Sequence, residues 1–155
     1  MTTLTFRNVD VSPEDPVSEW PLEAIQTALE RGSLADWRRL SEEIRALPWG
    51  RVARSVEEVL TYSRAYGVAE AMERVIARAR EDAERAERRA VADEIDELVR
   101  ASGASRAEFA STIGTSASRL STYATGRVTP SAALLLRMRT VSRQSASQRR
   151  STGTA

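Results

Sequence analysis

The sequence predicts an all-α fold, in which a small N-terminal helical domain is joined by a long helix to a second group of helices. Three observations predict it. Apolar residues recur three and four positions apart through most of the chain, as they do on the buried face of a helix. A serine followed three positions later by an acidic residue, the signature of a capping box, occurs at several expected helix starts. Neither proline nor glycine occurs from Val68 to Ser102, so this stretch can form one long helix.

The N-terminal segment, residues 1–16, is expected to be irregular, with one short extended piece at 4–11, because two prolines interrupt it. Residues 17–75 are expected to form the helical domain. Its first helix should begin at Pro21, since proline is favoured in the first helical turn, and end at Gly32. The spacing of the apolar residues between them predicts one buried face.

The second helix is expected to begin after Ser33, which with Asp36 resembles a capping box, and to end at Pro48–Gly50. One tryptophan, three leucines and one isoleucine share its apolar face. This helix should therefore pack on the first one.

The third helix is expected near residues 52–65. Ser55 with Glu58 supplies its capping signature, and Gly67 is expected to end it. The aromatic residues of the domain are predicted to pack in one core with the three apolar faces, because no convergent polar cluster accompanies them. These residues are Trp20, Trp37, Trp49, Tyr62 and Tyr66.

The long stretch from Val68 keeps helical spacing, but its middle, "RAREDAERAERRA", offers only alanine among charged residues. Two interpretations stay open: a solvated connecting helix with ion pairs three and four residues apart, or a thin interface with a second copy. The connecting helix is favoured, because alanine buries too little area to hold a dimer alone. It is assigned to residues 76–92, and the helix is expected to end at Gly103.

The stretch "SRAEFASTIGTSASRLSTYATGRVTPS" predicts two short helices joined by a tight turn, and a final helix from Thr129 and Pro130. The residues expected to cap, turn or end the two short helices are Ser105 with Glu108, Gly114, Ser116 and Gly126. Those expected to face the core are Phe109, Ala110, Ile113, Leu120, Tyr123, Leu134, Leu135 and Met138.

Residues 94–141 resemble the helix-turn-helix domains of the Cro and lambda-repressor family, often called the XRE family. Many relatives carry an acidic residue at the position of Ala124 and a basic partner at that of Val99. Both are apolar here, so packing is expected to replace an ion pair. The resemblance implies a lambda-repressor-like domain over residues 93–143. It depends on the entry at Gly103 and Ser105, the "EFA" of the first helix, the turn at Ile113–Gly114, the core positions Leu120 and Tyr123, and "GRVTPS" after the second helix.

The resemblance implies that the helix from Ser116 to Thr125 enters the major groove of double-stranded DNA. Since alanine, serine and threonine discriminate bases weakly, most affinity is expected from arginine on phosphate, and sequence preference from Arg119. Relatives bind as dimers, so a homodimer is expected. The residues implied to read bases are Ala117, Ser118, Arg119 and Thr122. Those implied to contact phosphates are Ser105, Arg106, Ser116, Thr125 and Arg127.

Charge is distributed unevenly along the chain. From Arg100 onward there are nine arginines and one acidic residue, Glu108, which gives +8, whereas the rest of the chain carries −7. All 23 basic residues are arginine, whose guanidinium can contact phosphate or guanine through two parallel hydrogen bonds. This asymmetry indicates that the C-terminal third faces a polyanion.

The last segment, 144–155, contains mainly small, polar and basic residues and is predicted to be a disordered tail.

Composition disfavours an enzyme. Cysteine and histidine are absent, which removes thiol nucleophiles, the usual zinc ligands and the usual general base near neutral pH. No cofactor or metal is therefore expected.

No apolar run approaches roughly 18 residues, and no basic-then-apolar start is present, so neither a membrane span nor a secretory signal is expected. The protein is expected in the cytoplasm, and at the nucleoid when bound to DNA.

These features predict a repressor-like, sequence-specific DNA-binding regulator. Two kinds stay open: a plain repressor, or the antitoxin of a toxin–antitoxin module, whose N-terminal domain binds a toxin protein. An alternative of a different class is a protein-interaction adaptor, in which the helix-turn-helix bundle no longer serves DNA binding.

Overall fold

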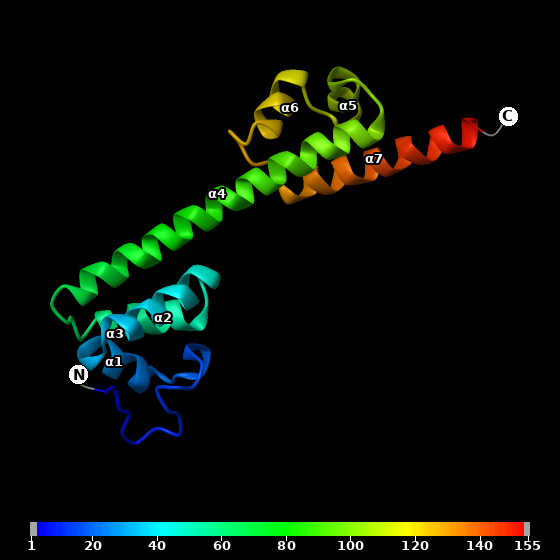
Figure 1. The fold of residues 1–155 in the computed structure, drawn as a ribbon. Coiled ribbons are helices and arrows are strands. Elements are labelled where there is room, and N and C mark those ends of the chain that lie inside the picture. The colour runs from blue at the N-terminus through cyan, green and yellow to red at the C-terminus, as the bar shows by residue number, and fades with distance from the viewer. Residues whose placement is uncertain (1–2, 154–155) are drawn as a thin grey trace. The chain divides into compact units, whose positions relative to one another are not determined.

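A computed structural model of the chain describes residues 3–153. Over that range the protein is all-α, as predicted, and contains no β-strand. The chain divides into two compact units, Met1–Ala83 (unit 1) and Glu84–Ala155 (unit 2). The elements are a 3-10 turn η1 (Val17–Glu19) and the helices α1 (Leu22–Arg31), α2 (Leu34–Ala46), α3 (Arg51–Leu60), α4 (Val68–Ser102), α5 (Arg106–Ile113), α6 (Ala117–Ala124) and α7 (Ala132–Thr152) (Figure 1).

Unit 1 is packed from η1, α1, α2, α3 and the first turns of α4. Trp20 is fully buried, and its ring meets Phe6 edge to face with 5.0 Å between the centroids. Its indole N–H donates to the carbonyl of Asp15 at 3.1 Å, and the guanidinium of Arg39 lies 4.8 Å from its ring centroid. Leu4 is also buried in this core. The segment before η1 therefore lacks regular structure but is packed against the helices.

The first two helices begin and end as predicted. Pro21 and Gly32 flank α1. Ser33 stands before α2, where its N–H and its hydroxyl both donate to the Asp36 carboxylate, at 2.8 and 3.0 Å. Gly32, with Ser33 directly after it, keeps α1 and α2 as separate helices.

The prediction of the third helix is correct at its start to within one residue, but it is wrong about the capping residue and about the end. α3 begins at Arg51, with Gly50 as its N-cap, and ends at Leu60 rather than near residue 65. Ser55 is only 9% exposed in the middle of the helix, so it is a core residue and not a cap. A Ser–Glu pair at (i, i+3) also falls on one face inside any amphipathic helix, which is why the signature misled. Gly67 stands directly before α4, with a φ of +73°.

Three of the five aromatic residues predicted for the core lie at the surface instead. Trp20 is buried and Trp37 is half-buried, but Trp49, Tyr62 and Tyr66 are 47%, 57% and 103% exposed. These three lie beyond the ends of α2 and α3, where the chain turns and is not covered by a helix. Core packing was therefore the wrong interpretation for them.

The long helix α4 runs from Val68 to Ser102 as predicted, and Gly103 follows it with a φ of +70°. Ala69, Met72, Ile76 and Ala79 of its first turns are buried in the core of unit 1. The alanines of its middle, at 86 and 90, are exposed. The last turns contribute Ile95 and Val99 to the core of unit 2.

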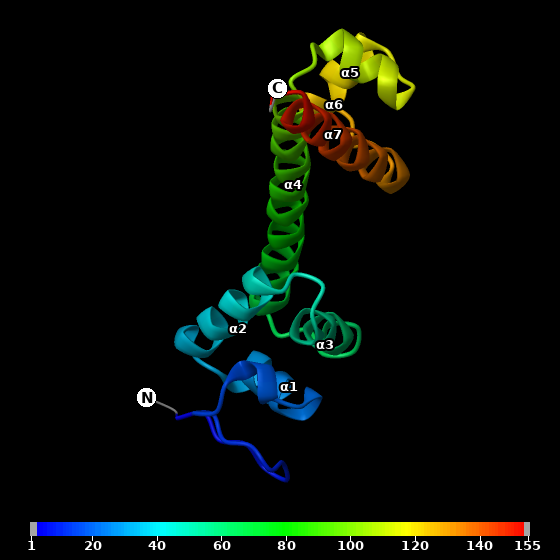
Figure 2. The same cartoon turned by 90° about the vertical axis from the view of Figure 1, so that its right-hand side faces the viewer.

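Unit 2 is packed from the second half of α4 with α5, α6 and α7, and α7 lies along α4 (Figures 1 and 2). The fully buried side chains at its centre are Ile95, Phe109, Ile113, Leu120 and Met138. Helix α7 begins at Ala132, two residues later than predicted, because the hydroxyl of Ser131 caps it by accepting from the N–H of Leu134 at 3.1 Å.

The predicted disordered tail is wrong for the described residues up to 153, because α7 continues to Thr152. The face of α7 toward α4 carries small residues that allow close approach, and the hydroxyl of Ser142 donates to the carbonyl of Leu98 at 2.9 Å. Further along, the guanidinium of Arg149 donates to the carbonyls of Ala101 and Ser102 at the end of α4. Composition alone had indicated disorder, but these contacts order the segment. Residues 154–155 lie outside the described range.

Candidate nucleic-acid interface

The turn between α5 and α6 is built by local capping. The hydroxyl of Ser105 accepts from the N–H of Glu108 at 3.2 Å, and the Glu108 carboxylate accepts from the N–H of Ser105 at 2.8 Å, which confirms the predicted capping box. The hydrogen bond from the Ser105 N–H lowers the pKa of the Glu108 carboxyl. Gly114 then ends α5 with a φ of +80°, a conformation that glycine adopts without strain. Three residues connect the two helices.

Helix α6 has one buried face. Leu120 is fully buried and Ala124 is 9% exposed, and both pack in the core of unit 2. Val99 of α4 is buried in the same core, so the two positions expected to replace an ion pair by packing are both part of it. This packing fixes which side of α6 faces water.

The residues predicted to read bases lie on the opposite side of α6. Ala117, Ser118 and Arg119 are exposed in its first turn, and Thr122 is half-buried one turn later. The Thr122 hydroxyl donates to the carbonyl of Ser118 at 2.9 Å, so its proton is already engaged while its lone pairs stay available. The guanidinium of Arg119 has no hydrogen bond or ion pair within residues 3–153.

The residues predicted to contact phosphates are in three different situations. The hydroxyls of Ser105 and Ser116 serve as helix caps, and that of Thr125 donates to the carbonyl of Thr122 at 3.2 Å. Arg106 pairs with Asp96 of α4 at 2.8 Å. Arg127, just after α6, is exposed, and its guanidinium has no partner in the described part of the chain.

Sequence reasoning missed that much of the positive charge of unit 2 is engaged internally. Arg139 pairs with Glu94 at 2.6 Å, which lowers the pKa of that carboxyl, and Arg100 pairs with Glu97 at 2.8 Å. Arg137 donates to the carbonyl of Ile113 at 2.9 Å, at the end of α5. The carboxylates involved lie in "DEIDEL" of α4, and their spacing in sequence gave no sign that α5 and α7 pack beside them.

The arginines of unit 2 whose guanidinium carries no hydrogen bond or ion pair among the described residues are therefore fewer than composition suggested. They are Arg88 and Arg89 on α4, Arg119 on α6, Arg127 after it, and Arg143 on α7. Two of the five belong to the segment predicted to meet DNA.

The residues between 3 and 153 contain no cluster of three potential metal ligands, and no helix among them is long and apolar enough to cross a membrane. Comparison with known proteins found no match, either to a protein family, to a curated sequence or to a solved structure.

Proposed function

We propose that the chain is a repressor-like transcriptional regulator that binds specific sequences of double-stranded DNA through a helix-turn-helix of the XRE type. The observation that carries this proposal is the outward face of α6. Arg119 is the only side chain there that is longer than threonine, while Leu120 and Ala124 hold the other face in the core. Such a helix can approach a surface closely along its whole length.

The major groove of B-DNA is about 12 Å wide and admits one α-helix. Small side chains on the approaching face let the backbone of α6 lie deep in this groove. The methyl group of Ala117 can then contact thymine, and the hydroxyl of Ser118 can bond to several bases. Neither contact discriminates strongly, so Arg119 is the residue proposed to give most of the base preference.

The pairing of the arginines supports distinct roles for them. Arg119 and Arg127 are exposed and unpaired within residues 3–153, so neither must break an internal ion pair to reach DNA. Arg106, in contrast, must exchange the Asp96 carboxylate for a phosphate. We therefore propose Arg127 as the stronger phosphate contact and Arg106 as a weaker one.

The test begins with selection of duplexes from a random library by the full chain, followed by affinity measurements on the selected duplex and on a scrambled one. Arg119→Ala should weaken binding to the selected duplex by about tenfold to a hundredfold, as expected for a lost arginine–guanine contact. The same variant should weaken binding to the scrambled duplex only a few-fold, because one phosphate contact at most is lost there.

Arg143→Ala is the matched control, because it removes another exposed, unpaired arginine of unit 2 from α7. It should change both affinities little and equally. Equal losses on the two duplexes for Arg119→Ala would contradict the readout role. If the selection enriches no sequence at all, the adaptor hypothesis replaces the regulator.

The homodimer and the toxin partner are parts of the same proposal. Two half-sites about 34 Å apart would appear in the selected duplexes as a palindrome if the chain binds as a symmetric pair. An antitoxin further requires that unit 1 offers a surface to another protein.

A further inference from the structure

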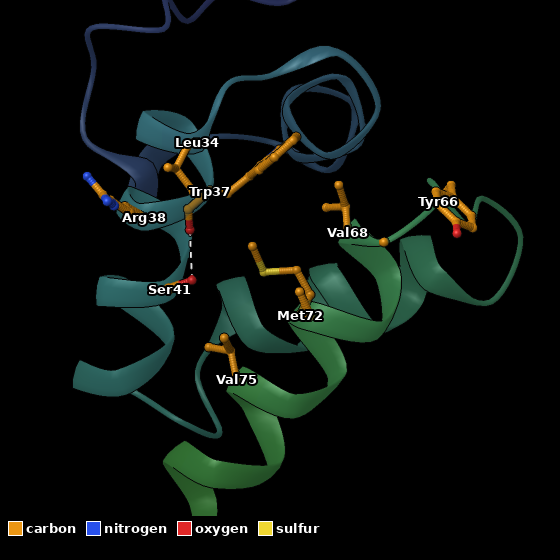
Figure 3. Close-up of a pocket in the computed structure, with 10 residues that line it drawn as sticks. Leu34, Trp37, Arg38, Ser41, Tyr66, Val68, Met72 and Val75 are labelled. Atoms are coloured by element: carbon orange, nitrogen blue, oxygen red, sulfur yellow. Dashed lines mark hydrogen bonds between the residues drawn. The ribbon is translucent and has the colours of Figure 1, made fainter.

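An apolar groove opens on unit 1 between α2 and the first turns of α4 (Figure 3). Its volume is about 430 Å³. Trp37 and Met72 lie on opposite walls, and Tyr66 stands at one end (Figure 3). The residues that line it are Leu34, Trp37, Arg38 and Ser41 of α2, Tyr66 and Gly67 before α4, and Val68, Ala71, Met72 and Val75 of α4.

The polar groups of Trp37 and Ser41 in the walls already have partners. The indole N–H of Trp37 donates to the carbonyl of Ala28 at 2.9 Å, and the Ser41 hydroxyl donates to the carbonyl of Trp37 at 2.8 Å (Figure 3). The groove therefore presents mainly apolar surface. Leu34 and Tyr66 are 59% and 103% exposed at its edges. Large apolar side chains exposed together around a groove are typical of a binding site.

The shape favours a protein segment over a small molecule. The groove lies open between two helices, and its walls offer no convergent set of free polar groups that would orient a small ligand (Figure 3). Apolar grooves between helices are a known mode of binding for amphipathic helices, whose apolar side chains recur at i, i+4 and i+7.

Charged side chains beside the groove indicate which kind of helix would bind there. The stem of Arg38 lines the groove while its guanidinium points away from the opposite wall (Figure 3). Arg45 lies seven residues further on, so it is on the same side of α2 and about 10 Å along the helix. Both are exposed, and neither side chain has a hydrogen bond or ion pair among residues 3–153. Glu42 lies between them on the same side of α2, so this edge carries two positive charges and one negative, whereas unit 1 as a whole, with 15 acidic residues and 11 arginines, is acidic.

We propose that the groove binds an amphipathic helix of a partner protein, with apolar side chains toward Trp37 and Met72 and with carboxylates about two turns apart toward Arg38 and Arg45. A second copy of the chain fits less well. A two-fold interface centred on this groove would bring the same two arginines of both copies to one seam, where they would repel. The inference depends on unit 1 alone and holds whether or not the chain binds DNA.

The probe is a fluorescein-labelled designed helix of about 18 residues, or five turns, with leucines on one face and two glutamates seven positions apart beside them. Its binding to the full chain is measured by fluorescence anisotropy. Saturable binding is expected. A second probe with lysine in place of both glutamates should bind about tenfold more weakly, because two favourable charge pairs become repulsive.

Two variants test whether the probe binds in the groove. Ala71→Arg should abolish binding, because Ala71 is an exposed groove residue and the long side chain fills the space without entering the core. Arg38→Glu should weaken the acidic probe about threefold to tenfold and strengthen the lysine probe. Circular dichroism of each variant checks that it is folded.

Arg54→Glu is the matched control, because it makes the same charge change at an exposed, unpaired arginine of α3 that does not line the groove. It should leave both probes unchanged. No binding of the acidic probe to the folded wild-type chain, or equal effects of Arg38→Glu and Arg54→Glu, overturns the proposal. So does a wild-type dimer in sedimentation that Ala71→Arg converts to a monomer, since a second copy would then occupy the groove.

Discussion

Unit 1 and unit 2 are both built from helices, but they differ in which surfaces remain available after their internal contacts are made. Unit 1 is acidic overall, yet Arg38 at the groove edge and Arg45 two turns along α2 are exposed and have unpaired side chains. Unit 2 has 12 arginines and 7 acidic residues, yet more than half of those arginines are engaged inside the unit. The charge that a surface offers to a ligand is therefore set by its unpaired side chains, because net charge also includes residues whose charge is already neutralised in internal ion pairs.

The largest expected effect tests whether the two units are stable independently. Phe109→Ala removes a fully buried side chain from the core of unit 2 and should destabilise that unit by about 3–5 kcal/mol. All three tryptophans belong to unit 1, so their fluorescence reports that unit alone, whereas circular dichroism reports the helices of both. In urea, the fluorescence transition should stay in place while part of the dichroism signal is lost earlier.

The control for this experiment is Leu136→Ala, because Leu136 is 58% exposed on α7 and its truncation should cost little. An equal shift of the fluorescence transition by Phe109→Ala would mean that the two units unfold together. The two units would then differ in their surfaces only and would not be separate folding domains.

A smaller effect is expected from the contact that ends α4 in unit 2. Arg149 donates to the carbonyls of Ala101 and Ser102, two of the groups that a helix end leaves unsatisfied. A Cβ at Gly103 would overlap Nη1 of the Arg149 guanidinium, so glycine at this position makes room for the contact. Arg149→Ala should therefore destabilise unit 2 by about 1 kcal/mol, measured by urea denaturation with circular dichroism.

Arg149→Lys should restore only part of this loss, since one ammonium cannot reproduce the two-pronged geometry of a guanidinium. Arg143→Ala, on the same helix but without a partner among the described residues, should have no such effect. Equal stability of Arg149→Ala and Arg143→Ala would show that the last turns of α7 contribute nothing to unit 2.

The sequence was sufficient for those features that depend on local chemistry. Pro21, Ser33, Ser105 and Gly114 act through neighbours within four residues, and the helices at these positions begin or end as predicted. The long helix α4 was also predicted correctly, because the absence of proline and glycine is a local property of its sequence.

The features that depend on distant packing were not predictable. Ser55 carries a capping signature but is buried, and Tyr66 is aromatic but fully exposed, because each depends on which helix covers it. Arg149 lies in a segment of disordered composition and is held by carbonyls 47 and 48 residues away. The candidate interface shows the same division. The exposure of Arg119 followed from helical periodicity, whereas the pairing of Arg106 with Asp96 depends on where α5 packs on α4.

The smallest expected effect concerns that last pair. Arg106 was predicted to hold a phosphate but lies 2.8 Å from the Asp96 carboxylate, so DNA must compete with Asp96 for it. Asp96→Asn keeps the shape of the side chain and removes its charge, and should strengthen binding to duplex DNA by about twofold to fivefold. The gain should be the same on a selected and on a scrambled duplex, because phosphate contacts carry no sequence information. The gain should also shrink as the salt concentration is raised.

Glu97→Gln is the control, because it removes a neighbouring carboxylate that pairs with Arg100 instead. The difference between the gains in DNA affinity of Asp96→Asn and Glu97→Gln therefore measures the release of Arg106 itself. If both variants strengthen DNA binding equally, the ion pair with Asp96 does not restrain Arg106. The carboxylates of α4 then weaken DNA binding only through their general electrostatic repulsion.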